Sequence, residues 1–509
     1  MLAIINSIVL LGLEGQKVRV EVDISNGLPV VEIVGLPDTS VKEARERVRA
    51  ALKNSGFEFP LRRIIVNLAP GDIKKEGAIY DLPIALGIIA ATSKKHHETQ
   101  KKVYAIGELS LEGSLQSVPG VLPMALALQE IDPGATLIVP AANANEASLA
   151  SKLEILAAHN LSQVVNYWNG KEKLPRIKPN IKLNQNNQVY TIDLADIKGQ
   201  LATKRGLEIA AAGGHNILLM GSPGAGKTML ARSLPSILPP LTYEEALTVT
   251  KIHSAAGLLA PNQGLITERP FRAPHHTASS ASIIGGGRIP KPGEVSLATH
   301  GVLFLDEMAE YRRDVLEALR QPLEDRVVTI SRLATTVTYP AAFLLIGSMN
   351  PCPCGFLGDQ DKECVCTPHQ INQYRKKLSG PLLDRIDLHL EVPRLTYTEI
   401  QNETPVENST TIRERVKLAR QRQLQRLKET GITCNAAMSS KHIQQFCQLT
   451  TSARRMLIEA FNKLNLSMRA HDRILKVALT IADLNGDKLI NDIHIAEAIQ
   501  YRSLDWNNE

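Results

Sequence analysis

The chain has 509 residues, of which 44% are hydrophobic and 22% charged, and its net charge is +6. This length predicts about three domains, and the composition is ordinary for a soluble globular protein. A basic balance of this size permits nucleic-acid binding without requiring it. The apolar first 13 residues lack the positive start and the cleavage site of a signal peptide. No apolar run is long enough to span a bilayer, so we expect a cytoplasmic protein that does not enter membranes.

Strand-like and helix-like segments alternate over residues 1–170, which we expect to form one α/β domain. The apolar start, residues 1–13, predicts a pair of strands. Further strands are expected over residues 18–24, 30–34 and 64–68, and a helix over residues 41–54. A polar stretch with prolines, lysines and asparagines then predicts a linker over residues 171–192.

A second α/β block covers residues 193–392, and the pattern is helical over residues 393–509. In this last region, Thr411 and Glu414 have the spacing of a capping box and predict the start of a helix. Another helix is expected over residues 471–484, with its end near a glycine. The chain is therefore predicted to be a multidomain α/β protein with a C-terminal helical lid.

The sequence GSPGAGKT is a complete phosphate-binding loop, preceded by a strand-like run at residues 217–220 and followed by a helix-like run. Its glycines let the backbone wrap closely around a polyphosphate. Lys227 reaches the outer phosphates, and the hydroxyl of Thr228 binds Mg²⁺. The pattern predicts a site for ATP with Mg²⁺. The residues assigned to it are Gly221, Ser222, Pro223, Gly224, Ala225, Gly226, Lys227 and Thr228.

The segment GVLFLDE is typical of a buried strand that ends in two acids, Asp306 and Glu307. Asp306 is expected to hold the Mg²⁺ shell. Glu307 would point the other way along the strand and polarise the attacking water. A later apolar run ends at Asn350, which is placed to orient that water. Arg385 lies just before a further strand, and nothing local indicates whether it serves its own nucleotide or that of a neighbour.

Six motifs are spread along the chain: GSPGAGKT, RPFRAPHHTAS, GEVSLATHGVLFLDEM, MNPCPCG, GPLLDRIDLH and SMRAHDRILKVALTIADL. Together they resemble the AAA+ family named for the magnesium chelatase I subunit, and within it the YifB/ComM branch. The resemblance implies an AAA+ core in which Asn350 is sensor 1 and Arg385 is an arginine finger acting in trans. It also implies that Arg469 is sensor 2 on the lid, with Arg473 as the rival for this role. A trans finger makes hydrolysis depend on assembly, so a homo-hexamer is expected.

Two N-terminal segments, GDIKKEGAIYDL and GELSLEG, resemble those that frame the Ser–Lys dyad of Lon-type proteases. The resemblance implies a Lon-like α/β fold, of the ribosomal S5 domain 2 type. Ile79 and Leu122 occupy the positions of the nucleophile and the amine, and neither can carry out Ser–Lys chemistry. We therefore expect a non-proteolytic module used for assembly or DNA contact, with Lys74 and Lys75 in a solvated turn.

A cluster of four cysteines with the spacing C-x-C-x₉-C-x-C follows the expected sensor 1 strand. Its members are Cys352, Cys354, Cys364 and Cys366. Without secretory signals the thiols are expected to be reduced, and clustered thiols then bind metal more often than they oxidise. Four thiolates can close a tetrahedral site, so we expect structural Zn²⁺ in an insert over residues 352–366. The C-x-C spacing is tighter than usual, which leaves free thiols and redox chemistry as alternatives and His369 and Glu363 as substitute ligands.

Two basic loops are candidates for DNA contact. The glycine-rich loop contains Arg288 and Lys291, and the expected hairpin that precedes the Asn350 strand contains Arg326 and Arg332. Family resemblance places both elements towards the central channel of a ring. Their side chains would contact phosphates and not bases. Aromatic residues are only 4% of the chain, so duplex backbone tracking is favoured over stacking on single-strand bases.

The resemblance implies an ATP-dependent hexameric motor that translocates on DNA and drives branch migration, helping to integrate DNA in natural transformation and homologous recombination. Two alternatives remain at this point. One is the ATPase subunit of a magnesium chelatase-type complex, although the chain carries no acidic integrin-type metal module. The other is a scaffold that binds nucleotide without turnover, against which Glu307 and Arg385 argue.

Overall fold

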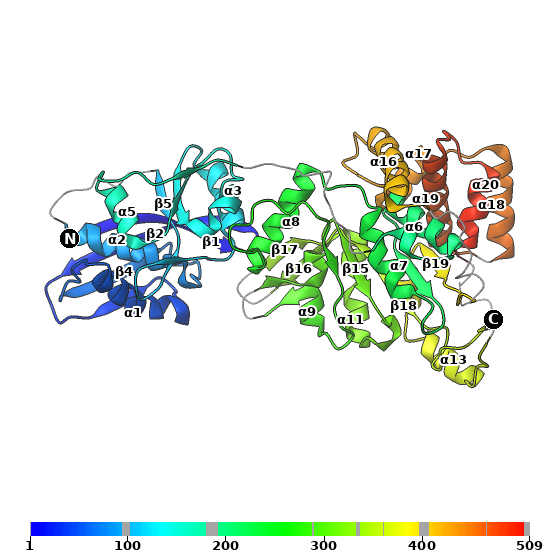
Figure 1. The fold of residues 1–509 in the computed structure, drawn as a ribbon, viewed down its shortest axis with the longest axis horizontal. Coiled ribbons are helices and arrows are strands. Elements are labelled where there is room, and N and C mark those ends of the chain that lie inside the picture. Colours follow the sequence, from blue (N-terminus) through cyan, green and yellow to red (C-terminus); the bar gives the residue numbers. More distant parts are fainter. Residues whose placement is uncertain are drawn as a thin grey trace.

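The computed structural model describes residues 2–93, 102–179, 192–287, 290–331, 336–359, 361–396, 407–464 and 466–502. Three regions follow one another along its longest axis in chain order (Figure 1). An N-terminal α/β region lies at one end, a second α/β region lies in the middle, and a group of C-terminal helices lies at the other end. Among the described residues, no helix combines the length and the apolar character needed to cross a membrane.

The N-terminal region is built on an eight-stranded sheet with the order β10-β9-β8-β5-β1-β2-β4-β3. Its strands are β1 Leu2–Leu11, β2 Glu14–Ser25, β3 Val31–Val34, β4 Arg63–Ala69, β5 Val103–Ala105, β8 Thr136–Pro140, β9 Glu154–Ala158 and β10 Arg176–Ile177, and a separate hairpin is formed by β6 Glu108–Leu109 and β7 Leu115–Gln116. Its helices are α1 Thr39–Asn54, α2 Asp81–Thr92, α3 Val121–Ile131, α4 Ala144–Ala147 and α5 Leu161–Trp168. The apolar side chains of β2 alternate, so Val18, Val20 and Val22 point into the core against which α2 and α3 pack.

The expected strands near residues 18–24, 30–34 and 64–68 and the helix near residues 41–54 are confirmed. The strand pair expected within residues 1–13 is wrong, because this segment forms one long strand, β1, whose partner is β2. The solvated turn expected at Lys75 is also wrong. Its side chain is fully buried and its ammonium donates to the carbonyl of Pro70. Burial lowers the pKa of Lys75, and the charge of Asp72 opposes this. Ile79 and Leu122 are both core residues.

The middle region contains a five-stranded sheet with the order β12-β15-β18-β11-β19, in which all neighbours are parallel. Its strands are β11 Ile217–Met220, β12 Phe271–Arg272, β15 Val302–Leu305, β18 Leu344–Met349 and β19 Leu388–Glu391. The helices of this region are α6 Leu201–Gly213, α7 Lys227–Ser233, α8 Tyr243–Ala256, α9 Ser280–Ile284, α10 Glu294–Leu297, α11 Arg313–Ala318, α12 Arg320–Asp325, α13 Pro368–Arg375 and α14 Gly380–Leu383. Every residue of β11, β15 and β18 is buried, which explains why these strands are continuous apolar runs in the sequence.

Two hairpins project from this sheet region, and the N-terminal region contacts one of them. The first consists of β13 Gly285–Gly286 and β14 Lys291–Pro292, and the second of β16 Val327–Ser331 and β17 Thr336–Pro340. The turn between β1 and β2 approaches β17 so closely that a Cβ at Gly12, where φ is +65°, would lie 2.1 Å from Cγ1 of Val337. A larger residue at this turn would therefore push the hairpin away.

Helices α3 and α8 join the N-terminal and middle regions through polar contacts. The N–H of Gly120 donates to the carbonyl of Ser254 over 2.8 Å, and the Ser254 hydroxyl donates to the buried carboxylate of Glu146. Burial raises the pKa of Glu146, although the hydrogen bonds from Ser254 and Asn143 oppose that shift. The two regions are thus held by a desolvated and fully hydrogen-bonded junction.

The C-terminal helices pack on the middle sheet region and share one apolar core with it. They are α16 Ser409–Arg426, α17 Ser440–Phe446, α18 Thr451–Lys463, α19 Met468–Asn485 and α20 Asp492–Gln500. The helix expected over residues 471–484 is confirmed within α19, which ends at Gly486 in the left-handed conformation. The capping box expected at Thr411 is wrong. The cap is Asn408, whose side chain accepts from the N–H of Thr411, so the helix begins a turn earlier.

Candidate active site

The phosphate-loop sequence lies at the carboxyl end of β11 and leads directly into α7. Gly224 and Gly226 have φ values of +81° and +89°, and a Cβ at either position would meet nothing within 4 Å. The backbone conformation, and not crowding by neighbouring groups, is therefore what favours glycine here. The loop turns tightly through these two left-handed glycines.

Lys227 is held at the centre of this loop. Its Nζ donates to the carbonyls of Gly221 and Ser222, over 2.6 and 3.0 Å, and to Oδ1 of Asn350 over 3.0 Å. Burial lowers the pKa of Lys227, and the charges of Asp306 and Glu307 partly oppose this. Asn350 follows β18, the parallel neighbour of β11, so its side chain reaches the same edge of the sheet.

The acidic pair meets the loop at this edge. Thr228 Oγ1 donates to Oδ2 of Asp306 over 3.1 Å, so the hydroxyl and the carboxylate predicted to share a Mg²⁺ ion lie in contact. Glu307 is not the last residue of a strand, because β15 ends at Leu305 and Glu307 has a left-handed φ of +50°. This turn, and not strand alternation, is what leaves its side chain 60% exposed.

Two residues at this edge were not predicted from the sequence. The hydroxyl of Ser348 donates to Asp306 and accepts from the N–H of Glu307 over 3.1 Å, which fixes the acidic pair. A serine inside an apolar strand is the signal that could have identified it. His276, which lies in the motif RPFRAPHHTAS, has Nδ1 3.9 Å from the Glu307 carboxylate.

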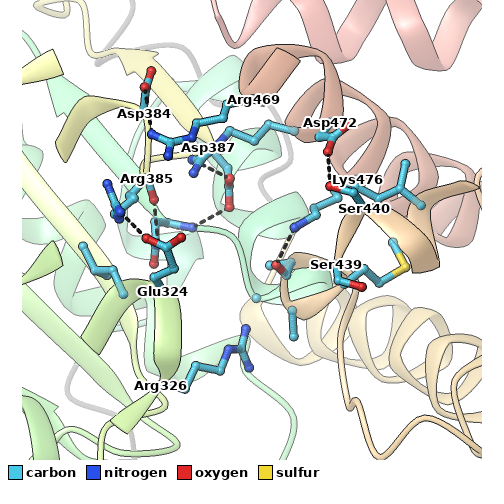
Figure 2. A pocket seen from close by; sticks show the side chains of 18 of the residues that line it. Glu324, Arg326, Asp384, Arg385, Asp387, Ser439, Ser440, Arg469, Asp472 and Lys476 are labelled. Atoms are coloured by element: carbon cyan, nitrogen blue, oxygen red, sulfur yellow. Dashed lines mark hydrogen bonds and ion pairs between the residues drawn. The ribbon is translucent and has the colours of Figure 1, made fainter. Parts of the chain in front are cut away.

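The predicted arginines gather around a different cavity, of about 480 Å³ (Figure 2). Arg385 donates to the carboxylate of Glu324 and, over 2.6 Å, to the carbonyl of Pro381. Arg469, at the start of α19, is 61% exposed, and its Nη1 lies 3.7 Å from Oδ2 of Asp384. The core sheet region supplies one wall of this cavity and the C-terminal helices supply the other.

This arginine cavity and the phosphate loop lie at opposite edges of the five-stranded sheet. The side chain of Asn216, the residue before β11, donates to the carbonyl of Arg385 over 2.9 Å and accepts from the N–H of Leu345 over the same distance. The phosphate loop begins after β11 ends, so the strand separates the two sites by roughly 13 Å at about 3.3 Å per residue. One chain therefore does not place Arg385 beside its own phosphate loop.

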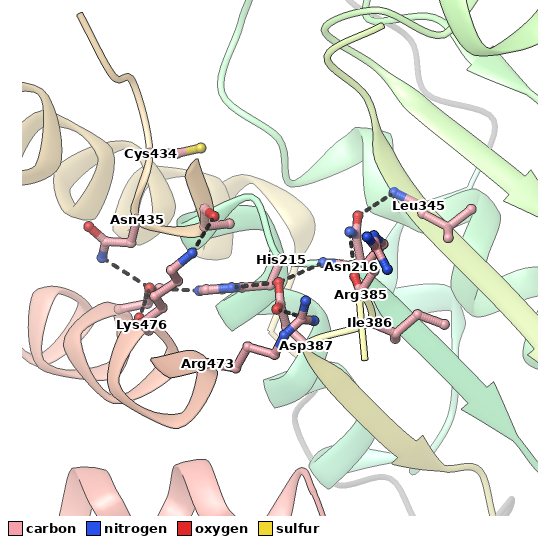
Figure 3. A network of polar contacts seen from close by, with 12 residues as sticks. His215, Asn216, Leu345, Arg385, Ile386, Asp387, Cys434, Asn435, Arg473 and Lys476 are labelled. Atoms are coloured by element: carbon pink, nitrogen blue, oxygen red, sulfur yellow. Dashed lines mark hydrogen bonds and ion pairs between the residues drawn. The ribbon is translucent and has the colours of Figure 1, made fainter. Parts of the chain in front are cut away.

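A buried polar network joins the arginine edge to the C-terminal helices (Figure 3). Asp387 contacts Nδ1 of His215 at 3.1 Å and Nη1 of Arg473 at 3.0 Å, and Nε2 of His215 lies 2.9 Å from Oγ1 of Thr480 on α19. Burial alone would raise the pKa of Asp387, but the charge of Arg473 and the hydrogen bond from His215 hold it well below its usual value. Arg473 is therefore engaged in an internal ion pair, whereas Arg469 faces solvent.

The four clustered cysteines form a group that could hold one metal ion. Their sulfur atoms all lie within 4.8 Å of one another, and the Sγ of Cys352 lies 3.3 Å from that of Cys354 and 3.6 Å from that of Cys364. The N–H of Cys354 donates to Sγ of Cys366 over 3.4 Å. Sulfur–sulfur edges of about 3.8 Å follow from tetrahedral Zn–S bonds of about 2.3 Å, so the donor set fits a mononuclear zinc site. His369 and Glu363 are not part of the group.

Family models match the chain in three consecutive parts. "Magnesium chelatase, subunit ChlI" matches residues 193–400, "Subunit ChlI of Mg-chelatase" matches residues 20–143, and "Magnesium chelatase, subunit ChlI C-terminal" matches residues 406–502. The chain is 46% identical to Competence protein ComM of Haemophilus influenzae, over 99% of this chain and 98% of ComM. It is 44% identical to YifB of Escherichia coli, over 99% and 97%. The chain belongs to the magnesium chelatase ChlI family of AAA+ ATPases, in its YifB/ComM branch. A more distant match, 25% identical over 49% of this chain and 33% of the relative, is the DNA replication licensing factor mcm7 of Schizosaccharomyces pombe.

The four basic residues predicted to contact DNA do not share the same surroundings. Arg288 and Arg332 lie outside the described residues. Lys291 is exposed on β14 and lines a cavity of about 340 Å³ between the middle and N-terminal regions. Arg326 lies at the base of the β16–β17 hairpin, where its Nη2 contacts Sγ of Cys434 at 3.6 Å. Lys291 and Arg326 line different cavities.

Proposed function

We propose that this protein is an ATP-driven DNA motor that assembles as a homo-hexameric ring and promotes branch migration, with a role in natural transformation and homologous recombination. The observation that carries the proposal is that the phosphate loop and Arg385 lie at opposite ends of strand β11, with Arg469 lining the same cavity as Arg385. Because one chain keeps Arg385 away from its own phosphate loop, an active site that uses both must combine the phosphate loop of one subunit with the Arg385 of a neighbouring subunit. A ring of subunits provides this arrangement at every interface.

In this proposal the carboxyl edge of the sheet binds ATP and activates water. Residues 221–228 wrap the phosphates, Lys227 neutralises their charge, and Thr228 with Asp306 holds Mg²⁺. Glu307 is the base that polarises the attacking water, and Asn350 orients it. The contacts of Lys227 with Asn350 and of Thr228 with Asp306 support these roles, because they bring all four side chains to one edge.

The arginine edge is proposed to complete the site of the next subunit. Arg385 would stabilise the charge that develops on the transferred phosphoryl group, as an arginine finger does. Arg469 would contact the same nucleotide from the lid. Exposure of its side chain and its single long ion pair with Asp384 support this role over that of the buried Arg473.

DNA is the proposed partner, bound through its backbone without regard to sequence. Relatives named as a competence protein and as a DNA replication licensing factor support this choice. Lys291 is the described residue that we assign to DNA, with Arg288 and Arg332 as expected contacts. Arg326 is a weaker candidate because its guanidinium is turned towards Cys434. We infer that residues 1–170 form a non-proteolytic, Lon-like module, since Ile79 and Leu122 are core residues.

The cysteine cluster is proposed to bind structural Zn²⁺. Four thiolates leave no open coordination position, so this ion would have no catalytic role. The short sulfur–sulfur distances support a single ion. A magnesium chelatase-type ATPase is the alternative function, and the descriptions of the matching family models favour it.

The test is ATP hydrolysis by the full chain with and without duplex or forked DNA. We expect DNA to stimulate turnover, and Glu307→Gln to bind ATP as a stable assembly without hydrolysing it. Stimulation by a porphyrin-binding partner, and none by DNA, would favour the chelatase.

A second test concerns the DNA contact. Lys291→Ala should reduce the slope of log DNA affinity against log salt concentration by about 1. The exposed Lys488, in the C-terminal region, provides the matched control.

A further inference from the structure

The cysteine insert touches the phosphate loop directly. Gly355, next to Cys354, has a φ of +88°, and a Cβ at this position would lie 2.7 Å from Cδ and 2.8 Å from Cγ of Pro223. Pro223 is in the first half of GSPGAGKT. The insert backbone is therefore packed so tightly against the loop that only glycine fits between them.

A second contact lies a few residues further along. Asp359 and Ser222 line the same cavity, of about 350 Å³, and the Ser222 hydroxyl lowers the pKa of the Asp359 carboxyl group. Oδ1 of Asp359 accepts from the N–H of Asp361 and of Lys362, over 3.0 and 3.1 Å, which ties this turn to the second half of the insert. The insert thus borders the phosphate loop at two consecutive residues, Ser222 and Pro223.

The insert has little of its own to keep it in this position. Its described residues form no helix or strand, and Cys352 is the one buried hydrophobic residue among them. The cysteine group links its two halves, because Cys352 and Cys354 lie before the turn and Cys364 and Cys366 lie after it. Apart from the thiols, the halves are joined by the hydrogen bonds of Asp359 and by Lys362, whose Nζ lies 4.9 Å from the centre of the Phe356 ring. An ion bound by all four sulfurs would close this turn into a fixed loop.

We propose that Zn²⁺ bound by the four cysteines holds the insert against Ser222 and Pro223, so that metal occupancy controls the affinity of the site for ATP. The inference rests on the proposed role of residues 221–228 in ATP binding. The metal acts at a distance, through the packing of Gly355 and the Asp359 turn, and contacts neither nucleotide nor water. Bound zinc keeps the loop in the shape that receives phosphates, and its loss leaves Pro223 without support.

The experiment measures zinc content and ATP affinity on the same full-length protein, purified under reducing conditions. Cys364→Ser removes a ligand on the half of the cluster that follows the turn, away from Gly355. We expect it to lose the metal and to bind ATP at least about tenfold more weakly, since small displacements of positioned groups have effects of this size. Cys447→Ser, outside the cluster, is the matched control and should change neither quantity.

A second variant covers the case in which Cys364→Ser fails to fold. Gly355→Ala keeps all four thiols, so it should retain one zinc per chain, yet its methyl group would displace Pro223 and weaken ATP binding. Zinc-free wild-type protein, or a metal-depleted variant with unchanged ATP affinity, would overturn the proposal. Lys227→Ala distinguishes the two hypotheses, because it should lose ATP binding while keeping its zinc. If wild-type protein holds zinc but binds no ATP, the proposed function fails and this inference fails with it.

Discussion

The two ends of strand β11 carry different groups of polar and charged side chains. Its carboxyl end opens into the phosphate loop, where Lys227, Asn350 and Asp306 meet. Its amino end begins at Asn216, which holds the backbone of Arg385 beside a cavity lined by arginines and acids. All strands of the sheet are parallel, so residues after strands share one edge and residues before strands share the other. Position relative to a strand, and not distance along the chain, therefore decides which of the two groups of side chains a residue joins.

The largest effects are expected when one cation is removed from each end of strand β11, because the two cations are proposed to have different roles. Lys227→Ala should abolish ATP binding, because the cation of the phosphate loop is lost. Arg385→Ala should bind ATP within about twofold of wild type and yet hydrolyse it about 10³-fold more slowly, the lower end of the effect of an arginine finger. Nucleotide affinity and single-turnover hydrolysis, measured on both variants, check this. Loss of ATP binding in Arg385→Ala would place this residue in its own nucleotide site.

Mixed assemblies test whether the two edges meet between subunits. Neither Lys227→Ala nor Arg385→Ala should be active alone, but a mixture contains interfaces that join an intact phosphate loop to an intact arginine. We expect part of the wild-type rate, with a maximum near equal amounts of the two variants, in a steady-state ATPase assay. A rate that stays at the background level at every ratio, although the subunits exchange, would contradict the trans arrangement.

Arg469 and Arg473 lie one turn apart on α19. Replacing each of them in turn distinguishes a structural role from a catalytic role. Arg473→Ala removes the arginine partner of the buried Asp387, which keeps its contacts with His215 and Asn216, and should cost about 3 kcal/mol of stability. Arg469→Ala removes an exposed side chain, so its stability should stay within about 0.5 kcal/mol of wild type while hydrolysis falls. Thermal unfolding and ATPase rates on the two variants give the comparison. A large stability loss in Arg469→Ala would reverse the assignment.

A pH effect of smaller size is expected from His389 on β19. Burial and the nearby charges of Arg502 and Arg473 lower its pKa to about 3, and neither ring nitrogen has a hydrogen-bond partner among the described residues. The unfolded state therefore binds the proton more readily. The stability contributed by neutral His389 is complete above about pH 6.5 and is lost as the pH falls towards 3, by about 2 kcal/mol at pH 5. Unfolding of His389→Leu and wild type at pH 8 and 5 should show a flatter profile for the variant, and parallel profiles would contradict it.

Local sequence determined much of the fold, because periodicity and turn chemistry are local properties. The apolar run over residues 217–220 predicted a strand, and the helix expected after GSPGAGKT is present as α7. Local reasoning failed where burial depends on distant segments. Lys75 was expected in a solvated turn and is buried. A different, local error concerns the helix expected to start at Thr411: it begins at Ser409, because Asn408 is the cap and its side chain accepts from the N–H of Thr411.

The chemical groups of this protein can be read directly from the chain: the motif GSPGAGKT, two acids after an apolar run, four clustered thiols and several arginines. Which of them meet depends on the folded arrangement of the strands. It brings Ser348 to Asp306 and Gly355 to Pro223, and it separates Arg385 from the phosphate loop. The physical reason is that side-chain type and spacing are fixed along the chain, whereas contact depends on how parallel strands align in register. No local pattern encodes this alignment.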